Sequence, residues 1–169
     1  MKTLTNKLFI SALTAYAFSS GIAFAEGGKV SGSAALSYTK QEASLASAAD
    51  GHMLVFGELT GVNKNTDGSG YMSDAEVTNR EIGQLFQGNG PHSGYYTMSK
   101  DGNTTTALWK GEVTTVMKDN VPKTSFKGTW EYVNGTGKFT GIKGKGKYSG
   151  YFTSKTTYNV DWDGDFSLK

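Results

Sequence analysis

The chain has 169 residues, with 17 lysines and arginines, 15 aspartates and glutamates, and no cysteine. This length is enough for one domain with a single apolar core. The absence of cysteine excludes a disulfide-stabilised scaffold, thiol catalysis and cysteine-ligated metals, so stability must come from apolar packing.

The first 25 residues have the organisation of a secretory signal peptide. Lys2 and Lys7 form a positive region, a mostly apolar stretch runs from Leu8 to Phe18, and Ala23-Phe24-Ala25 fits a small-x-small cleavage site. The apolar stretch is too short, and too often interrupted by Ser and Thr, to predict a membrane span. We therefore predict an exported protein, periplasmic or extracellular, in which residues 26–169 form one domain.

Removal of the signal peptide changes the charge of the chain. Two of the 17 basic residues and none of the acidic residues lie in it, which leaves 15 of each sign in the mature chain. A dedicated nucleic-acid binder needs a basic surplus for its phosphate contacts. We therefore expect no nucleic-acid partner.

After the cleavage site, short apolar segments alternate with polar turns. Turn residues occur at 63–70, 87–91, 101–102 and 119–122, and the segments between them predict strands at 30–38, 52–62, 71–86, 94–99 and 104–117. Residues Gln41 to Ala49 are rich in Ala and Ser, which is compatible with either a short helix or a loop.

The stretch from Ser125 to Phe152 predicts two coupled strands. Phe126, Gly128, Trp130 and Tyr132 alternate with Lys, Thr and Glu, and the alternation resumes from Tyr148 to Phe152. Between the two halves, five glycines permit a tight turn with positive φ angles.

Residues Thr157 to Leu168 form the most regular alternation of the chain. Apolar residues and one glycine share one face, whereas Asp161, Asp163 and Asp165 lie on the other. This segment brings the number of predicted strands to eight, with no long helix. Eight strands favour an all-β fold, a closed antiparallel barrel without exposed edges; a two-sheet sandwich is the alternative.

A glycine lies two residues from each tryptophan on the same strand face. The pairs are Trp109 with Gly111, Gly128 with Trp130, and Trp162 with Gly164. Glycine lets a strand bend sharply, and a neighbouring ring can cover the bare backbone. We therefore predict an inward face of aromatics and glycine, and we name five aromatic residues as the candidate ligand-binding set: Trp109, Trp130, Tyr148, Phe152 and Trp162.

The segments Gly128-Thr-Trp-Glu-Tyr-Val133 and Gly135-Thr-Gly-Lys-Phe-Thr-Gly-Ile-Lys-Gly144 resemble a segment of allene oxide cyclase-like barrel proteins and of plant dirigent proteins. Together with Gly88-Asn-Gly-Pro-His-Ser-Gly-Tyr95, they are similar to segments of secreted bacterial members of this superfamily. The resemblance implies a single eight-stranded antiparallel barrel, allene oxide cyclase-like or lipocalin-like. It also allows cofactor-free cyclase or isomerase chemistry and, through the dirigent likeness, a homo-oligomer.

Four polar residues are the candidate catalytic groups: Glu58, Glu76, His92 and Tyr95. His92 follows a Gly-Pro turn that could fix it at a barrel mouth, where it could serve as an acid or base; hydrogen bonding into the loop backbone is the structural alternative. Glu76 and Arg80 share a strand face and would have to pair if that face were buried. The opposite face, with Ala75 and Val77, is more apolar and is therefore expected to point inward.

We expect no metal site and no cofactor. Asn63-x-Asn65-x-Asp67-Gly68 has the spacing of a calcium loop, but it lacks the closing Glu, and its flanks are strands. The lysines around 138–147 form either an anion-binding patch or a solvated face balanced by the aspartates of the last strand.

Three functions are compatible with these observations. The first is a barrel that binds a small apolar or aromatic ligand, because the inner face is aromatic and no nucleophile–base or metal constellation is present. The second is a cofactor-free isomerase or cyclase. The third is a structural or interaction module with a filled barrel.

Overall fold

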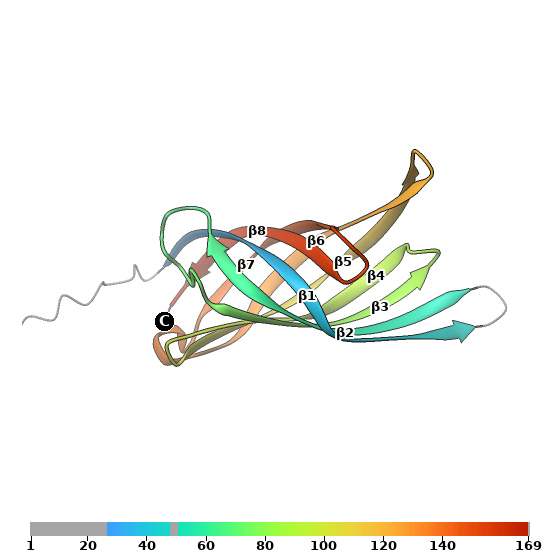
Figure 1. Ribbon diagram of the computed structural model, residues 1–169. Helices are drawn as coiled ribbons and strands as arrows, with labels where there is room; N and C mark the ends of the chain where they lie inside the picture. The colour runs from blue at the N-terminus through green and yellow to red at the C-terminus, as the bar shows by residue number, and fades with distance from the viewer. Residues whose placement is uncertain (1–26, 48–50, 169) are drawn as a thin grey trace, which may run out of the picture.

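The computed structural model describes residues 27–47 and 51–168, so the predicted signal peptide lies outside the described residues. Eight antiparallel strands join in chain order into a closed barrel, as expected from the sequence (Figure 1). A short 3₁₀ turn, η1 (Gly137–Phe139), separates the sixth and seventh strands. The strands are β1 (Gly27–Ser47), β2 (His52–Asn65), β3 (Glu76–Phe86), β4 (Gly90–Lys100), β5 (Asn103–Lys118), β6 (Val121–Thr136), β7 (Lys143–Phe152) and β8 (Thr157–Ser167).

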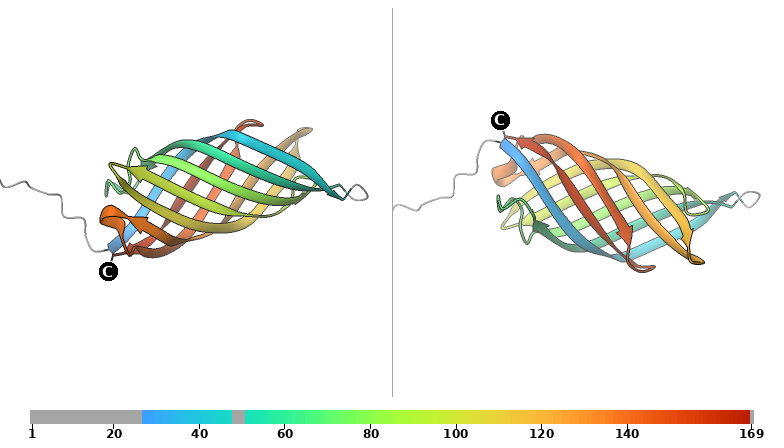
Figure 2. Two further views of the ribbon diagram at one scale, coloured as in Figure 1. Left: turned by 90° about the horizontal axis from the view of Figure 1, so that it is seen from below. Right: turned by 90° about the horizontal axis from the view of Figure 1, so that it is seen from above.

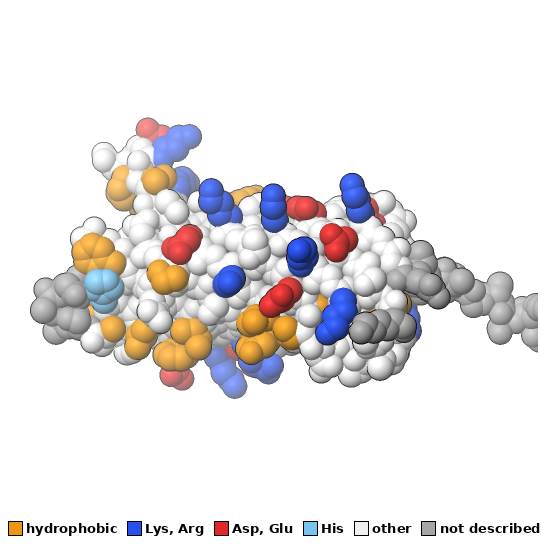
Figure 3. All heavy atoms as spheres, turned by 180° about the vertical axis from the view of Figure 1, so that it is seen from behind, with side chains coloured by type: hydrophobic (Ala, Val, Ile, Leu, Met, Phe, Trp, Pro, Cys, Tyr) orange, Lys and Arg blue, Asp and Glu red, His pale blue; other side chains and the backbone are white. Residues whose placement is uncertain are grey.

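Strand parity divides the barrel wall into an apolar interior and a charged exterior. On β8, Tyr158, Val160 and Trp162 are buried, whereas Asp161 and Asp163 are exposed. Outside the wall, Lys145 is opposite Asp165 and Lys147 is opposite Asp163. The lysines of β7 thus lie on a solvated face balanced by the aspartates of β8. Figure 3 shows such interspersed charges on the rear face of the barrel.

Each tryptophan is directly opposite a glycine of the neighbouring strand. Trp162 pairs with Gly32, Trp109 with Gly94, and Trp130 with Gly146. A Cβ atom added to Gly32 would lie 2.4 Å from Cζ2 of Trp162, which is closer than a real Cβ contact. The rings therefore occupy the space that the missing side chains leave, and glycine is the residue that allows this contact.

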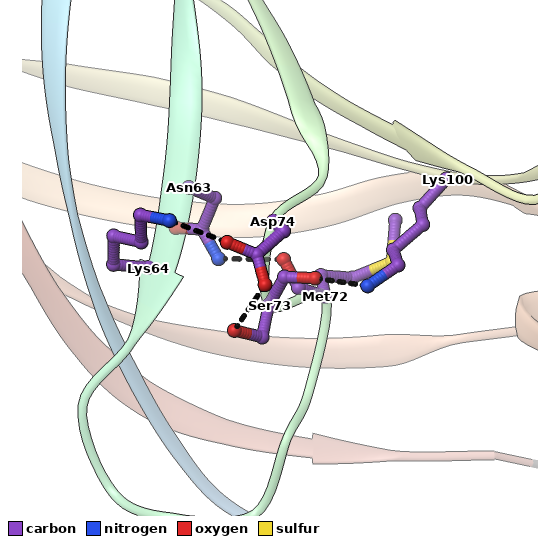
Figure 4. A network of polar contacts seen from close by, with 6 residues as sticks. All are labelled: Asn63, Lys64, Met72, Ser73, Asp74 and Lys100. Atoms are coloured by element: carbon purple, nitrogen blue, oxygen red, sulfur yellow. Dashed lines mark hydrogen bonds and ion pairs between the residues drawn. The ribbon is translucent and has the colours of Figure 1, made fainter.

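One end of the barrel is closed by the connection between β2 and β3. Its Tyr71 and Met72 are buried together with Phe139 and Ile142, which follow β6. Polar contacts hold this connection in place (Figure 4): the Asn63 side chain donates to the Met72 carbonyl at 2.9 Å, Lys64 pairs with Asp74, and Lys100 donates to the Ser73 carbonyl. The tip of the loop is polar and exposed.

Two long hairpins project beyond the opposite end. The paired ends of β1 and β2, and the β5–β6 hairpin, extend past the turns of β3–β4 and β7–β8, and they lie apart from each other (Figures 1 and 2). The two ends of the barrel therefore differ: a packed loop covers one end, and hairpins surround the other.

Three predictions of local structure were wrong. The turn expected at 87–91 ends earlier, because Gly90, Pro91 and His92 already pair with β5 and belong to β4. Residues 41–47 are neither helix nor loop but continue β1, because they pair with β2 from Gln41–Gly57 to Ser47–His52; residues 48–49 lie outside the described residues. The third strand begins at Glu76 rather than at 71, because residues 71–74 form a turn with positive φ at Met72 (45°) and Asp74 (61°).

Replacement of Gly32 by alanine is expected to destabilise the barrel by about 1–3 kcal/mol, because the new Cβ would overlap the Trp162 ring. Gly28→Ala, on the same strand, is the matched control: a Cβ there meets nothing within 4 Å, so its effect should stay within about 0.5 kcal/mol. Urea unfolding measures both free energies. Equal stability of the two variants would contradict the packing of tryptophan on glycine.

Candidate functional site

The barrel encloses a cavity of about 510 Å³ that opens at the end where the hairpins project. Its lining reaches Lys123 near the start of β6 and Ser154 of the β7–β8 turn at that end, whereas Tyr71 and Phe139 at the closed end do not line it. All five candidate ligand-binding aromatics contribute to the wall: Trp109, Trp130, Tyr148, Phe152 and Trp162. The barrel is therefore not completely filled, in contrast to the filled barrel that the third function requires.

The cavity wall contains one carboxyl group, Glu81, held by hydrogen bonds from three strands. The Tyr38 hydroxyl of β1 donates to one carboxyl oxygen of Glu81. Asn79 Nδ2 and the Tyr158 hydroxyl contact the other oxygen at 3.1 and 3.4 Å. Asn79, itself buried, accepts a bond of 2.9 Å from the Trp109 indole, which fixes the orientation of its amide.

The position of Glu81 alters its acid–base properties. Burial raises the pKa of the Glu81 carboxyl above its usual range, although its bonds to Tyr38, Tyr158 and Asn79 oppose the shift. Burial and the neighbouring Glu81 also raise the pKa of the Tyr38 hydroxyl, which stays protonated at neutral pH. This pair combines a carboxyl group with a raised pKa and a phenol that can donate a hydrogen bond.

A second polar pair, His92 on β4 and Tyr148 on β7, lies in the same cavity. The Tyr148 hydroxyl lies 3.0 Å from Nε2 of His92. The His92 ring also packs edge-on against Trp109 and Phe126, with centroids 4.7 and 5.6 Å away. Burial lowers the pKa of His92 to about 4, so the ring is neutral at neutral pH.

Two glycines leave the space that the Tyr148 side chain needs to reach His92. Three successive cross-strand pairs connect β4 to β7: His92 with Gly111, Gly111 with Gly128, and Gly128 with Tyr148. A Cβ at Gly111 or Gly128 would approach the Tyr148 hydroxyl to 2.5 or 2.6 Å. The absence of side chains on the two middle strands therefore lets the tyrosine reach the histidine.

Of the four candidate catalytic residues, only His92 lies in the cavity. Glu58 is on the outer wall and pairs with Arg80 at 2.8 Å. Glu76 and Tyr95 are exposed on the outer wall as well. The expected inward face of β3 is correct, since Ala75 and Val77 are buried. It follows that Glu76 and Arg80 are not a buried pair.

Four further residues line the cavity and were not predicted from the sequence: Glu81, Tyr38, Asn79 and Tyr96. The signal for Glu81 was present in the alternation, because it shares the parity of Ala75, Val77 and Asn79. A carboxyl group on an otherwise apolar strand face is expected to be buried. Polar residues are usually exposed, so a buried one is an informative exception. Tyr38 carried no comparable signal, since its partner lies 43 residues away.

The loop with calcium-like spacing uses its donors within the protein. Asn63 is buried and accepts a bond from the Trp162 indole at 3.1 Å, and the Asp67 carboxylate accepts bonds from Ser31, Asn65 and Ser69. In residues 27–47 and 51–168, no three His, Asp or Glu side chains form a group that could hold a metal ion.

No family model and no curated protein sequence matches the chain. Among solved structures, the chain is similar to the pterocarpan synthase dirigent protein GePTS1, with 15% identity, a TM-score of 0.46, and coverage of 94% of this chain and 100% of that one. A likeness of this size transfers no residue role and no activity. No helix in the described part of the chain is long and apolar enough to cross a membrane.

The buried state of His92 predicts a specific pH dependence of stability. The folded protein holds the pKa of His92 near 4, below the ordinary value of 6.5. As the pH falls from about 6.5 to about 4, the unfolded chain binds a proton that the folded protein does not bind. The free energy of unfolding is therefore expected to fall across this window.

Chemical denaturation at a series of pH values measures this effect. His92→Gln should reduce the loss of stability between pH 6.5 and 4 relative to the unchanged protein. An unchanged pH profile in His92→Gln would show that the ring is not held in its neutral form.

Proposed function

We propose that this protein binds a small, largely apolar ligand, with an aromatic or aliphatic body, inside its barrel. The observation that carries the proposal is the cavity of about 510 Å³, open at one end and lined by aromatic side chains of several strands. Pockets of about 300–1,000 Å³ with mostly apolar walls and a few placed polar groups are typical of small-molecule sites. Glu81 with Tyr38 and His92 with Tyr148 are the polar groups that would orient the ligand.

A panel of aromatic and aliphatic compounds tests this function on the chain from Glu26 onward. Because Trp109, Trp130 and Trp162 line the cavity, a bound compound should change tryptophan emission, and native mass spectrometry should show one ligand per barrel. Val113→Phe, which adds volume inside the cavity, is expected to weaken binding at least about tenfold. Val133→Phe, on the exposed outer wall, should bind like the unchanged protein.

Circular dichroism of both variants separates lost binding from lost folding, and Ala107→Leu provides a second way of narrowing the cavity. The proposal fails if no compound binds, or if the inner and outer variants bind equally well.

A second candidate function is cofactor-free isomerisation of the bound ligand, which the Glu81 site favours. A carboxyl group with a raised pKa next to a protonated phenol can move a proton on an enclosed substrate, and an apolar cavity keeps water away from the reacting atoms. Glu81 would transfer the proton, and the Tyr38 hydroxyl, once it exchanges its bond to Glu81 for one to the substrate, would donate a hydrogen bond to the substrate oxygen.

Incubation of each binding compound, followed by chromatography and mass spectrometry, detects a product of equal mass and different retention. General acid–base catalysis contributes about 10²–10⁴-fold, so Glu81→Gln is expected to lower the rate by at least about 100-fold. Glu58→Gln, on the outer wall, is the matched control and should keep the full rate. Equal rates in both variants would exclude Glu81 as the proton-transferring group.

A further inference from the structure

Among residues 27–47 and 51–168, Gly83 on β3 is the one strand glycine that lines the cavity. Gly88 lines it too, but it lies in the β3–β4 turn and has a φ of 76°. The glycines opposite the tryptophans do not line the cavity, because the Trp rings cover their backbone. The barrel wall therefore presents bare strand backbone to the cavity at Gly83.

The space over Gly83 is open. The heavy atoms nearest to a Cβ added there would be those of the Leu85 side chain, at 3.5 and 3.8 Å, which are ordinary van der Waals distances. A Cβ added to Gly94 would instead lie 2.7 Å from the Trp109 ring. Gly83 thus lacks the close ring contact of the glycines opposite the tryptophans.

The strand itself does not require glycine at this position. Glycine inside a strand marks a bulge, a bend, or a place where another group approaches the backbone. There is no bulge, since Gly83 pairs with Val55 on one side and His92 on the other without a shift in either register. Its φ is outside the positive region that favours glycine. Of the remaining reasons, the open space over Gly83 favours an approaching group.

Four side chains that line the cavity frame this bare backbone. Val55 and His92 are its cross-strand partners on β2 and β4. Glu81 and Leu85 precede and follow it by two residues on the same face of β3. Strand geometry places the Cα atoms of the first pair about 10 Å apart and those of the second pair about 13 Å apart. The frame has the dimensions of a small flat ring system, with two apolar and two polar edges.

The polar edges have hydrogen-bonding capacity that the protein leaves unused. One carboxyl oxygen of Glu81 accepts a bond from Tyr38, and a carboxyl oxygen can accept two. Nε2 of His92 lies 3.0 Å from the Tyr148 hydroxyl, and no residue in the described part of the chain forms a hydrogen bond with its Nδ1. A ligand with an O–H or N–H donor at its edge matches this capacity.

We propose that Gly83 is the floor of a subsite for a small flat ring that carries a hydrogen-bond donor. The ring lies on the backbone of Gly83 as the Trp rings lie on other glycines of the wall. Val55 and Leu85 contact its apolar edges, and its donor points to Glu81 or His92. The inference rests on the ligand binding proposed above and deepens it, since it names the subsite and makes flatness the selected property.

Calorimetric titration of the chain from Glu26 onward with 2-naphthol tests the subsite. Decahydro-2-naphthol has the same hydroxyl on a puckered ring, and 2-methoxynaphthalene has the flat ring without a donor. Both are expected to bind at least about tenfold more weakly than 2-naphthol. Gly83→Ala should also weaken 2-naphthol binding about tenfold, because the methyl group lifts the ring from the backbone. Gly28→Ala, a glycine with free space outside the cavity, is the matched control and should bind like the unchanged protein.

Nuclear magnetic resonance of the unchanged protein gives a second readout that does not depend on the folding of a variant. Bound 2-naphthol should shift the Hα resonances of Gly83 upfield through its ring current and leave those of Gly28 in place. The subsite is overturned if the Gly83 resonances do not move, if the three compounds bind equally, or if the two alanine variants bind equally.

The failure of the subsite is distinguishable from the failure of ligand binding. If 2-naphthol does not bind, or binds without contact to Gly83, while another compound binds and Val113→Phe weakens that binding, the subsite is wrong and the binding function stands. If no compound binds at all, both proposals fail.

Discussion

The contact between a tryptophan ring and a glycine on the next strand is the interaction on which the barrel depends. Three such contacts, at Trp109, Trp130 and Trp162, occur on different strand pairs and place large rings where the wall has no side chain of its own. Glycine lets the strands curve into a small closed barrel, and the ring covers the backbone that glycine exposes. Because the rings lie against the wall, they leave space in the middle, and the cavity is a consequence of this packing.

Glycine also positions the polar groups of the interior. Gly111 and Gly128 give the Tyr148 hydroxyl its path to His92, and Gly57 leaves room for the Tyr38 ring that reaches Glu81. Trp109 connects the two pairs, since its indole binds Asn79 and its ring packs on His92. The same residue types thus shape the wall and hold the pairs Glu81–Tyr38 and His92–Tyr148, each joined by a hydrogen bond in a low-dielectric interior.

Much of this fold follows from sequence alternation. A one-residue slip of β8 would bury Asp161, Asp163 and Asp165, so the register of Tyr158, Val160 and Trp162 is strongly determined. The path of β1 beyond Tyr38 was not predictable in this way, because Ala and Ser do not distinguish a strand that pairs with β2 from a helix. The site was predicted in part: the aromatic lining was found from parity, whereas Glu81 with Tyr38 depends on a contact between distant strands.

The central claim is that the barrel interior is an apolar cavity with space for a ligand. Crystals of the protein pressurised with xenon test this claim most directly, because xenon enters empty apolar cavities and not filled cores. The packing described here predicts xenon density inside the barrel, among Trp109, Phe126 and Tyr148, on the side that opens between the hairpins. A barrel interior occupied throughout by side chains, without xenon, would contradict it.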